Sequence, residues 1–335
     1  MIVSTNTRFL ALALSLVLTC LLGASIVSAQ TVHRDFTPVD GLLRIGPEPE
    51  RQIHLVDKGQ TFILPQQPPV RGVIVFLDRM PLDPAPWLAD STSLEAMALE
   101  NGLAVLRMTT GNPLDFFFSD SVVHDVASRI ETVLASYHLG DIPLFHVGLS
   151  LAGTRSLKLT EYLVKHDDEF RLHTGAVAVV DAPLDMIRFW HAEQRAADIA
   201  YHPAAADEGR WVTYLLETNL GGTPESARER YIEYSPYTYG ELGGGNARYL
   251  KDIPVRAYHE PDVNWWIDNR RKDYNSMNSI DLAALINDLK LMGNERAELI
   301  TTHNQRSGYD DGSSPHTWSI VDQQELIRWF VEQLP

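Results

Sequence analysis

Residues 145–153 of the chain read FHVGLSLAG and connect an expected buried strand to an expected helix. A serine at such a junction, here Ser150, must lie in a sharp turn with strained backbone angles. Because the turn brings backbone close to backbone, the residue two positions earlier has to be tiny, and Gly148 meets that need. Ala152 is small enough for the position two residues later. The first helical turn also points N–H groups toward the serine oxygen, which favours a developing oxyanion there.

Strand-like and helix-like segments alternate on both sides of this junction. The expected strands are 72–77, 103–108, 142–147, 176–180, 255–258 and 297–301. The expected helices are 91–100, 119–137, 151–166, 280–292 and 320–334. Continuous apolar runs such as GVIVFL at 72–77 are typical of strands buried on both faces. Upstream, the segments 51–56 and 60–64 flank Asp57-Lys58-Gly59 and predict a hairpin, and residues 30–50 predict an extended lead-in.

This order predicts one α/β domain over residues 30–335. A hairpin followed by alternating strands and helices favours a mostly parallel eight-stranded sheet with helices on both faces. The alternation stops at residues 184–250, which are rich in aromatic residues, acids and glycine. We expect this segment to form a helical cap insertion over the carboxyl ends of the strands, where open α/β sheets bind ligands.

Residues 50–335 resemble the α/β-hydrolase superfamily in this pattern. The segment Gly148-Leu149-Ser150-Leu151-Ala152-Gly153 stands where that superfamily carries its nucleophile elbow. The superfamily has glycine two positions after the nucleophile, whereas this chain has Ala152 followed by Gly153. The resemblance implies that Ser150 is the nucleophile and that an acid and then a histidine follow it along the chain.

The resemblance implies a base on the loop after the last strand, where two histidines occur. His316 lies on a Gly-, Asp- and Ser-rich loop before the closing helix and is the predicted base. His303 is the alternative, but its place at the strand end is more typical of a structural histidine packed under the loop. A base within hydrogen-bond reach is needed because a serine alone is a poor nucleophile.

The acid that orients this base is predicted to be Asp262. It follows the Pro-led strand 253–258, at the place where the superfamily usually carries its aspartate. Glu260 is close enough in sequence to take the same role. Asp181 ends the strand 176–180, a position that some members of the superfamily use. The sequence leaves these alternatives open, since the choice depends on geometry.

The resemblance also implies an oxyanion hole made of two backbone N–H groups. One belongs to Leu151, the residue after the nucleophile, and the other is expected from Met80 on the loop after 72–77. Many members carry His-Gly on that loop, whereas this chain has Asp78-Arg79. Trp265-Trp266 forms either a wall of the substrate pocket or a packing contact beneath the cap. The simplest interpretation of the basic cluster 270–272 is a solvated loop or helix end.

The first 29 residues have the layout of a secretory signal. Arg8 is their only charge, an apolar run covers 9–23, and small residues at 27–29 predict cleavage after Ala29. A transmembrane anchor is the alternative, but the run is shorter than the roughly 20 residues that span a bilayer. A lipoprotein signal at Cys20 is another, although Thr19 is bulky for that role. We expect a secreted or periplasmic protein whose mature chain has lost its only cysteine.

Composition narrows the functional classes. The chain has 28 basic and 44 acidic residues, a formal net charge of −16, so a nucleic-acid or anionic-membrane partner is not expected. No Cys/His metal spacing or glycine-rich phosphate loop occurs, and no cofactor is expected. The predicted activity is hydrolysis of a small carboxylic ester through an acyl-enzyme on Ser150. Hydrolysis of an amide or peptide, and a non-catalytic binding protein on the same fold, are the alternatives.

Overall fold

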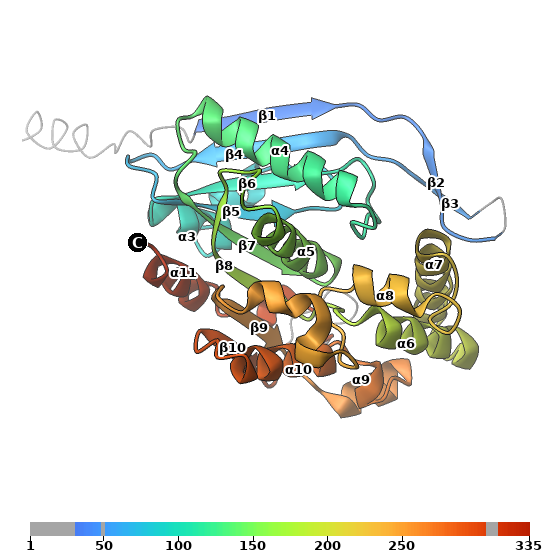
Figure 1. Cartoon of the computed structure of the whole chain (residues 1–335). Coiled ribbons are helices and arrows are strands. Elements are labelled where there is room, and N and C mark those ends of the chain that lie inside the picture. Colours follow the sequence, from blue (N-terminus) through green and yellow to red (C-terminus); the bar gives the residue numbers. More distant parts are fainter. Residues whose placement is uncertain (1–30, 48–50, 306–313) are drawn as a thin grey trace, which may run out of the picture.

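The computed structural model describes residues 31–47, 51–305 and 314–335 (Figure 1). The predicted signal segment 1–29, with Cys20, lies outside these residues, as does the part of the loop before His316 that spans 306–313. In the described ranges, no helix is long and apolar enough to cross a bilayer.

The core of the molecule is an eight-stranded, mostly parallel sheet, as the sequence predicted. Its order is β1-β4-β6-β5-β7-β8-β9-β10. The first two pairings are antiparallel and the other five are parallel. The strands are, in sheet order, β1 (Thr31–Thr37), β4 (Lys58–Leu64), β6 (Leu103–Thr109), β5 (Gly72–Leu77), β7 (Pro143–Leu149), β8 (His173–Val180), β9 (Val255–His259) and β10 (Ala297–Thr301).

The hairpin predicted for 51–64 is wrong, because its two strands take other partners. The first, β3 (Gln52–His54), pairs with β2 (Leu42–Arg44) in a separate two-stranded ribbon. The second, β4, pairs with β1 and with β6. β4 begins at Lys58, inside the expected turn, and its Thr61–Ile63 segment is buried between these neighbours. The expected lead-in at 30–50 therefore contains a sheet strand, β1, which takes the place beside β4. Local turn residues did not predict this, because they do not select a strand's partner.

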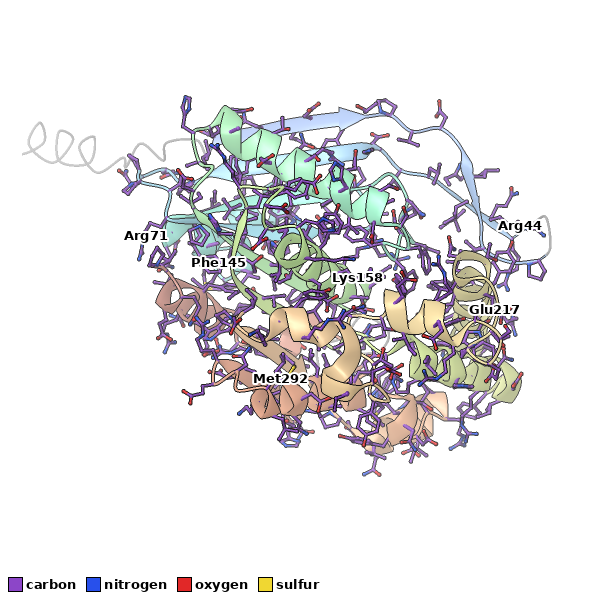
Figure 2. The ribbon with its side chains drawn as sticks, in the orientation of Figure 1. Arg44, Arg71, Phe145, Lys158, Glu217 and Met292 are labelled. Carbon is purple, nitrogen blue, oxygen red and sulfur yellow. The ribbon has the colours of Figure 1, made fainter. Side chains whose placement is uncertain are left out.

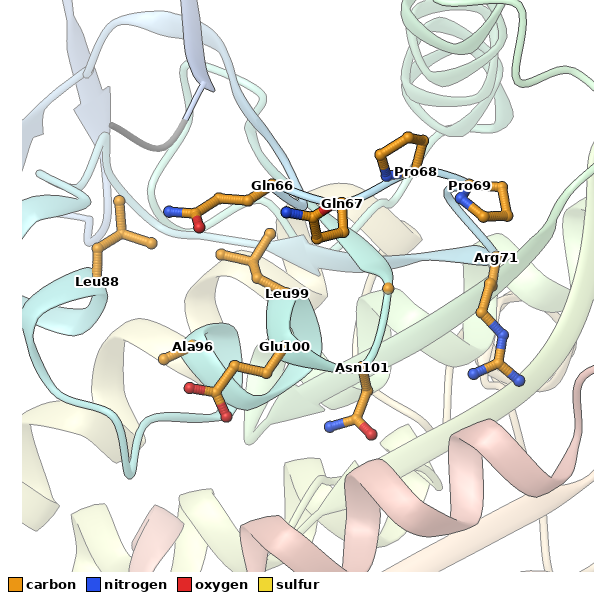
Figure 3. A pocket seen from close by; sticks show the side chains of 11 residues that line it. Gln66, Gln67, Pro68, Pro69, Arg71, Leu88, Ala96, Leu99, Glu100 and Asn101 are labelled. Carbon is orange, nitrogen blue, oxygen red and sulfur yellow. The ribbon is translucent and has the colours of Figure 1, made fainter. Parts of the chain in front are cut away.

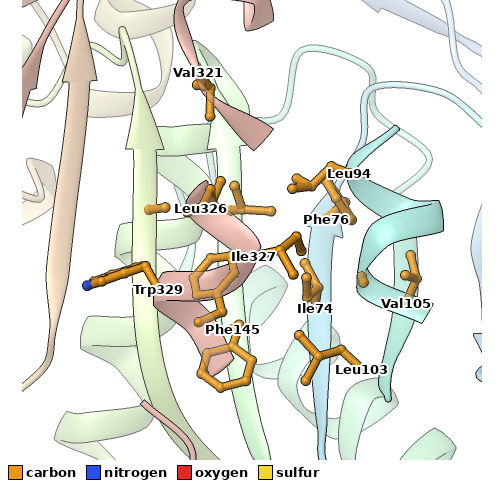
Figure 4. Packing of buried hydrophobic residues seen from close by; sticks show 14 of the residues in the cluster. Ile74, Phe76, Leu94, Leu103, Val105, Phe145, Val321, Leu326, Ile327 and Trp329 are labelled. Carbon is orange, nitrogen blue, oxygen red and sulfur yellow. The ribbon is translucent and has the colours of Figure 1, made fainter. Parts of the chain in front are cut away.

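The apolar strand β5 is buried on both faces, as its sequence predicted. Ile74 and Phe76 face α3 (Leu94–Glu100) and α11 (Gln323–Glu332), as Figure 4 shows. Val73 and Val75 alternate with them and pack under α4 (Asp120–Ser136) and α5 (Leu151–Lys165). The further helix α10 (Ser279–Leu291) covers β8 and β9 next to α5. Phe145 of β7 lies in the middle of the layers in Figure 2 and packs on Phe330, with ring centroids 5.0 Å apart.

A helical unit follows β8 and occupies the segment expected to interrupt the alternation. It contains α6 (Met186–Ile199), α7 (Pro203–Leu220), α8 (Arg228–Tyr234) and the 3₁₀ segment η1 (Leu242–Leu250). Figure 1 shows α6, α7 and α8 grouped at one end of the sheet. Gly209 allows α7 to approach α6 closely, because a Cβ there would lie 2.3 Å from the carbonyl oxygen of Glu193.

Half-buried Lys158 joins this helical unit to α5 (Figure 2). Its Nζ donates a 2.7 Å hydrogen bond to the carbonyl oxygen of Tyr234 and lies 4.0 Å from the centroid of that tyrosine's ring. Burial lowers the pKa of the Lys158 ammonium to about 8. The contact fixes α8 against α5, which begins directly after Ser150.

Candidate active site

Ser150 sits in the strained turn that the sequence predicted. It separates β7 from α5 and has φ 57° and ψ −129°, a backbone conformation that costs a non-glycine residue energy. Its N–H donates to the carbonyl oxygen of Val180 at 2.8 Å, and its own carbonyl accepts from the N–H of Gly153 at 2.9 Å. These bonds hold the serine at the carboxyl end of the central strand, beside the end of β8.

Two glycines make the turn sterically possible. A Cβ on Gly148 would lie 2.2 Å from the carbonyl carbon of Ala152, a contact that no side chain tolerates. A Cβ on Gly153 would lie 2.8 Å from the carbonyl oxygen of Gly148 and 2.7 Å from the Cβ of Ala182. The half-buried Ala152 between them carries its methyl group without disturbing the turn. The turn therefore forms although Ala152 stands where the superfamily pattern has glycine.

The carboxylate that contacts His316 is Asp181. The Nδ1 atom of His316 lies 2.6 Å from Oδ2 of Asp181. Since a carboxylate only accepts, Nδ1 carries the hydrogen, and a neutral imidazole then keeps the Nε2 lone pair for a proton. Asp181 is buried at the end of β8, and its backbone is bound on both sides. Its N–H donates to the backbone carbonyl oxygen of Tyr258 at 2.9 Å, and its carbonyl oxygen accepts from Nδ2 of Asn278 at 3.0 Å.

The prediction of Asp262 as the partner of the base is therefore corrected. Its Oδ1 accepts from the N–H of Trp265 at 2.9 Å and caps α9 (Val263–Arg270). Asp262 lies three residues beyond β9, so the chain has already turned into this helix. The rival Asp181 lies directly at the end of β8, the strand next to the nucleophile strand. The sequence identified both aspartates as candidates. The choice between them depends on how the strands lie side by side, which only the tertiary structure shows.

Glu260, the other alternative, supports the loop that carries the base. Its Oε2 accepts from the N–H of Gln305 at 2.9 Å and from the hydroxyl of Thr302 at 3.2 Å. Ser319, on the far side of the same loop, donates to the carbonyl oxygen of Gln305. The two sides of the loop are thus tied together near the position of His316. The rival base His303 is exposed rather than packed under the loop.

Ser150 and His316 line one cavity of about 350 Å³. Trp265 and Trp266 form part of its wall, with ring centroids 5.0 Å apart and ring planes at 89°. Both tryptophans thus line the cavity beside Ser150, as the pocket-wall interpretation requires. Phe189, Glu193, Ala205 and Glu208 line the side formed by α6 and α7, and Arg270, Lys272, Met277 and Asn278 line the side that follows β9.

A larger cavity, of about 580 Å³, lies elsewhere (Figure 3). Its wall includes Arg71 and Gly102, which directly precede β5 and β6, so it opens at the amino ends of these strands. No serine or histidine is among the described residues that line it. Because Ser150 and His316 share its wall, the cavity beside Ser150 is the candidate active site. Among the residues that the structure describes, no group of three His, Cys, Asp or Glu side chains is placed to hold a metal ion.

The groups around the half-buried His316 act on the pKa of its imidazole in opposing directions. Burial alone lowers the pKa of the imidazole, but the Asp181 carboxylate at 2.6 Å outweighs it and the pKa is raised overall. The carboxylate of Glu208 adds to the increase, and the ammonium of Lys272 opposes it. The protonated imidazole that forms when His316 accepts a proton is thus stabilised by its own site.

The sequence predicted a solvated basic cluster at 270–272, and this prediction is wrong for Lys272. Its Nζ lies 2.6 Å from Oε1 of Glu193, and the two side chains are 12% and 2% exposed. Burial raises the pKa of the Glu193 carboxyl, and the Lys272 charge works against that increase. This ion pair joins α6 to the segment after α9 within the wall of the cavity.

Arg155 is a buried residue behind the candidate site that the sequence interpretation did not single out. Its side chain is 1% exposed, and it donates to the carbonyl oxygens of Leu77 at 3.3 Å, Asp78 at 3.2 Å and Pro113 at 3.4 Å, and also to that of Asp115. Burial lowers the pKa of this guanidinium to about 10. Arg155 lies four residues after Leu151, on the same face of α5, and this spacing was the available signal.

These contacts fix the loop after β5, where the second oxyanion donor was expected. Asp78 pairs with Arg107 at 2.6 Å, and Arg79 donates to the carbonyl oxygen of Pro113 at 3.3 Å, so the two neighbours do not pair with each other. The Met80 side chain is about half exposed. At the other side of the serine, Leu151 is the first residue of α5, and the N–H groups of a first helical turn have no partner within the helix.

Comparison with known proteins finds likeness in structure alone. No protein-family model and no curated protein sequence matches the chain. The backbone matches the Pyrococcus horikoshii acylaminoacyl peptidase with a TM-score of 0.51 and 12% identity, over 96% of this chain and 43% of that one. The chain therefore spans less than half of the peptidase.

Two shorter proteins match over most of both chains. Mycobacterium tuberculosis MPT51 (FbpC1) has a TM-score of 0.50 and 12% identity, over 90% of this chain and 99% of that one. A thermostable esterase from Pseudomonas putida has a TM-score of 0.50 and 10% identity, over 91% of this chain and 82% of that one.

The close backbone contact at Gly148 predicts that two glycine substitutions differ in their effect on stability. Gly148→Ala should lower the free energy of unfolding by about 3 kcal/mol, because the added methyl group meets the Ala152 backbone. Gly140→Ala is the matched control, since a Cβ there meets nothing within 4 Å, and should change stability by about 0.5 kcal/mol or less. Urea denaturation measures both, and equal stabilities of the two variants would contradict the argument.

Proposed function

We propose that this chain, which has the α/β-hydrolase fold that its sequence resembled, is a serine hydrolase that cleaves carboxylic esters. The observation that carries the proposal is the His316–Asp181 contact of 2.6 Å in the wall of the cavity that Ser150 also lines. An imidazole oriented by a buried carboxylate, in one cavity with a serine at a strained turn, is the arrangement that activates a serine hydroxyl.

In the proposed reaction, Ser150 attacks the carbonyl carbon of the ester and His316 Nε2 takes the hydroxyl proton. Asp181 holds the tautomer and stabilises the imidazolium, whose formation its charge already favours. The N–H groups of Leu151 and Met80 would bind the oxyanion, and Arg155 fixes the loop that carries the second donor. His316 then gives the proton to the leaving alcohol, and water releases the acyl group by the same route.

The parts around this site complete the proposal. The helical unit at 184–250 acts as a cap, because α6 and α7 contribute walls to the cavity beside Ser150. The segment 1–29 directs export, so that the enzyme works outside the cytoplasm as a secreted or periplasmic protein. Its substrate is a small molecule that fits the cavity of about 350 Å³.

A fluorophosphonate probe tests the nucleophile. The mature protein should be labelled, and Ser150→Ala should abolish labelling, because the probe reacts with the activated hydroxyl. Ser136→Ala, at an exposed serine of α4, is the matched control and should label like the wild type. Labelling of Ser150→Ala at the wild-type level would refute the assignment. A folded wild-type protein that is neither labelled nor active on esters would favour a non-catalytic binding protein.

The acid is tested by two aspartate substitutions. Asp181→Asn should lower kcat on the order of 10⁴-fold, by analogy with the same change in a serine protease, because the His316 tautomer is no longer fixed. Asp262→Asn should keep most of the activity, since asparagine also caps a helix. Steady-state hydrolysis of p-nitrophenyl acetate measures both. The reverse order of the two activities would return the role to Asp262.

The raised pKa of His316 predicts the pH dependence of the reaction. The base must be neutral, so kcat/KM should fall as the pH decreases through the pKa of His316, and this limb should lie above the usual value of about 6.5. Glu208→Gln should move the limb to lower pH, because it removes a charge that raises this pKa. Glu332→Gln, at an exposed residue of α11, should leave it in place. An unchanged limb in Glu208→Gln would be inconsistent with this electrostatic account.

A further inference from the structure

We propose that the cavity beside Ser150 selects esters of a neutral, polyhydroxylated ring of the sugar type, with the ring as the leaving alcohol. The inference rests on the proposed function and names the substrate class of the same site. It follows from three properties of the cavity wall: its aromatic faces, its buried charges and the balance of those charges.

The aromatic part of the wall suits the apolar face of a small ring. Trp265 and Trp266 stand at 89° to each other with centroids 5.0 Å apart, so they form a corner rather than a flat stack. Phe189 of α6 contributes a further aromatic side chain to the lining. Aromatic faces pack against C–H groups and bury a large area for each residue. A pyranose ring presents such a C–H face.

The polar part of the wall suits the hydroxyl groups of the same ring. The Lys272 ammonium has three hydrogens to donate, and Glu193 takes one of them at 2.6 Å. The Arg270 guanidinium lies over the Trp265 ring at 5.4 Å and brings more donors to the same side. Donors therefore line this side of the cavity, and the hydroxyl groups of a ring can accept hydrogen bonds from them.

Burying an ion pair is costly, and an apolar pair of similar size would pack here without that cost. A wall meant for an alkyl chain would have no use for Lys272 and Glu193, which are 12% and 2% exposed. The charged side chains that line the cavity also balance, with Glu193 and Glu208 against Arg270 and Lys272. A charged ligand would therefore find no excess of opposite charge in the wall, whereas a neutral polar ligand needs none and can still form hydrogen bonds with these side chains.

The size of the cavity limits the ligand to about one ring. Its volume of about 350 Å³ is at the lower end of the range for ligand pockets. In the reaction, Ser150 Oγ gives its proton to His316 and forms a bond to the acyl carbon, and the bond from that carbon to the ester oxygen of the sugar hydroxyl breaks. His316 delivers the proton to this oxygen, and the free polyol leaves. Water then hydrolyses the acyl-enzyme to the carboxylic acid.

Three acetate esters test the proposal with the mature wild-type protein. Methyl 6-O-acetyl-glucopyranoside carries the hydroxylated ring, cyclohexylmethyl acetate has a carbocycle of matched size, and p-nitrophenyl acetate reports on the catalytic groups. We expect kcat/KM for the sugar ester to exceed that for the carbocyclic ester by at least about tenfold, mainly through a lower KM. This factor corresponds to one good hydrogen-bonded contact.

The outcomes separate this inference from the proposed function. Equal rates, or a preference for the carbocyclic ester, together with hydrolysis of p-nitrophenyl acetate, would overturn the sugar-type substrate and leave the serine hydrolase standing. Absence of hydrolysis of all three esters, together with absence of fluorophosphonate labelling, would overturn both proposals.

Variants of the wall provide the second arm. Glu193→Leu with Lys272→Met removes the whole ion pair, so neither charge is left buried alone, and should abolish the preference for the sugar ester. Lys290→Met, at an exposed residue near the end of α10, is the matched control and should retain the preference. Arg270→Gln alters a half-buried side chain and should reduce the preference independently. Melting temperatures establish that each variant is folded, and a folded double variant with an unchanged preference would refute the inference.

Discussion

The close approach of the backbone at Gly148 to that at Ala152 is the constraint on which the rest of the site depends. It allows Ser150, with its positive φ, to be the single residue between the end of β7 and the start of α5. The hydroxyl is thereby placed at the carboxyl end of the central strand, and the first turn of α5 points toward it. A wider turn would separate the serine from both the helix terminus and the end of β8. The elbow thus fixes the point on which the other groups converge.

The order of the strands then determines which side chains can reach that point. β8 is the immediate neighbour of β7, so Asp181 at its end is one strand away from Ser150. β10 lies at the sheet edge beyond β9, yet His316, which follows β10 in the chain, contacts Asp181 at the end of β8. Glu260, directly after β9, accepts a hydrogen bond from Gln305. The acid near the usual position therefore supports the base loop, while the contact with the base has moved to β8.

Cationic side chains that are buried or half-buried connect the segments around α5. Arg155 binds the backbone carbonyls of two loops, and Lys158 binds a carbonyl of α8, so α5 holds both the loop after β5 and the helical unit after β8. Lys272 completes the wall opposite, by its contact with Glu193 of α6. Each of these charges is desolvated, and each is compensated by carbonyl groups or by a carboxylate. An acidic protein thus keeps several of its cations inside, next to the candidate active site.

The sequence by itself determined the fold class, the elbow and the residues that end the strands. Periodicity and glycine spacing are local properties, so the strands β5 to β10, the turn at Ser150 and the loop position of His316 could be read along the chain. The tertiary structure alone decided which segments meet. It paired β4 with β1 and β6 instead of β3, chose Asp181 over Asp262, and turned Lys272 inward to Glu193. Each of these depends on lateral distances between segments far apart in sequence, which hydrophobic spacing and turn residues do not encode.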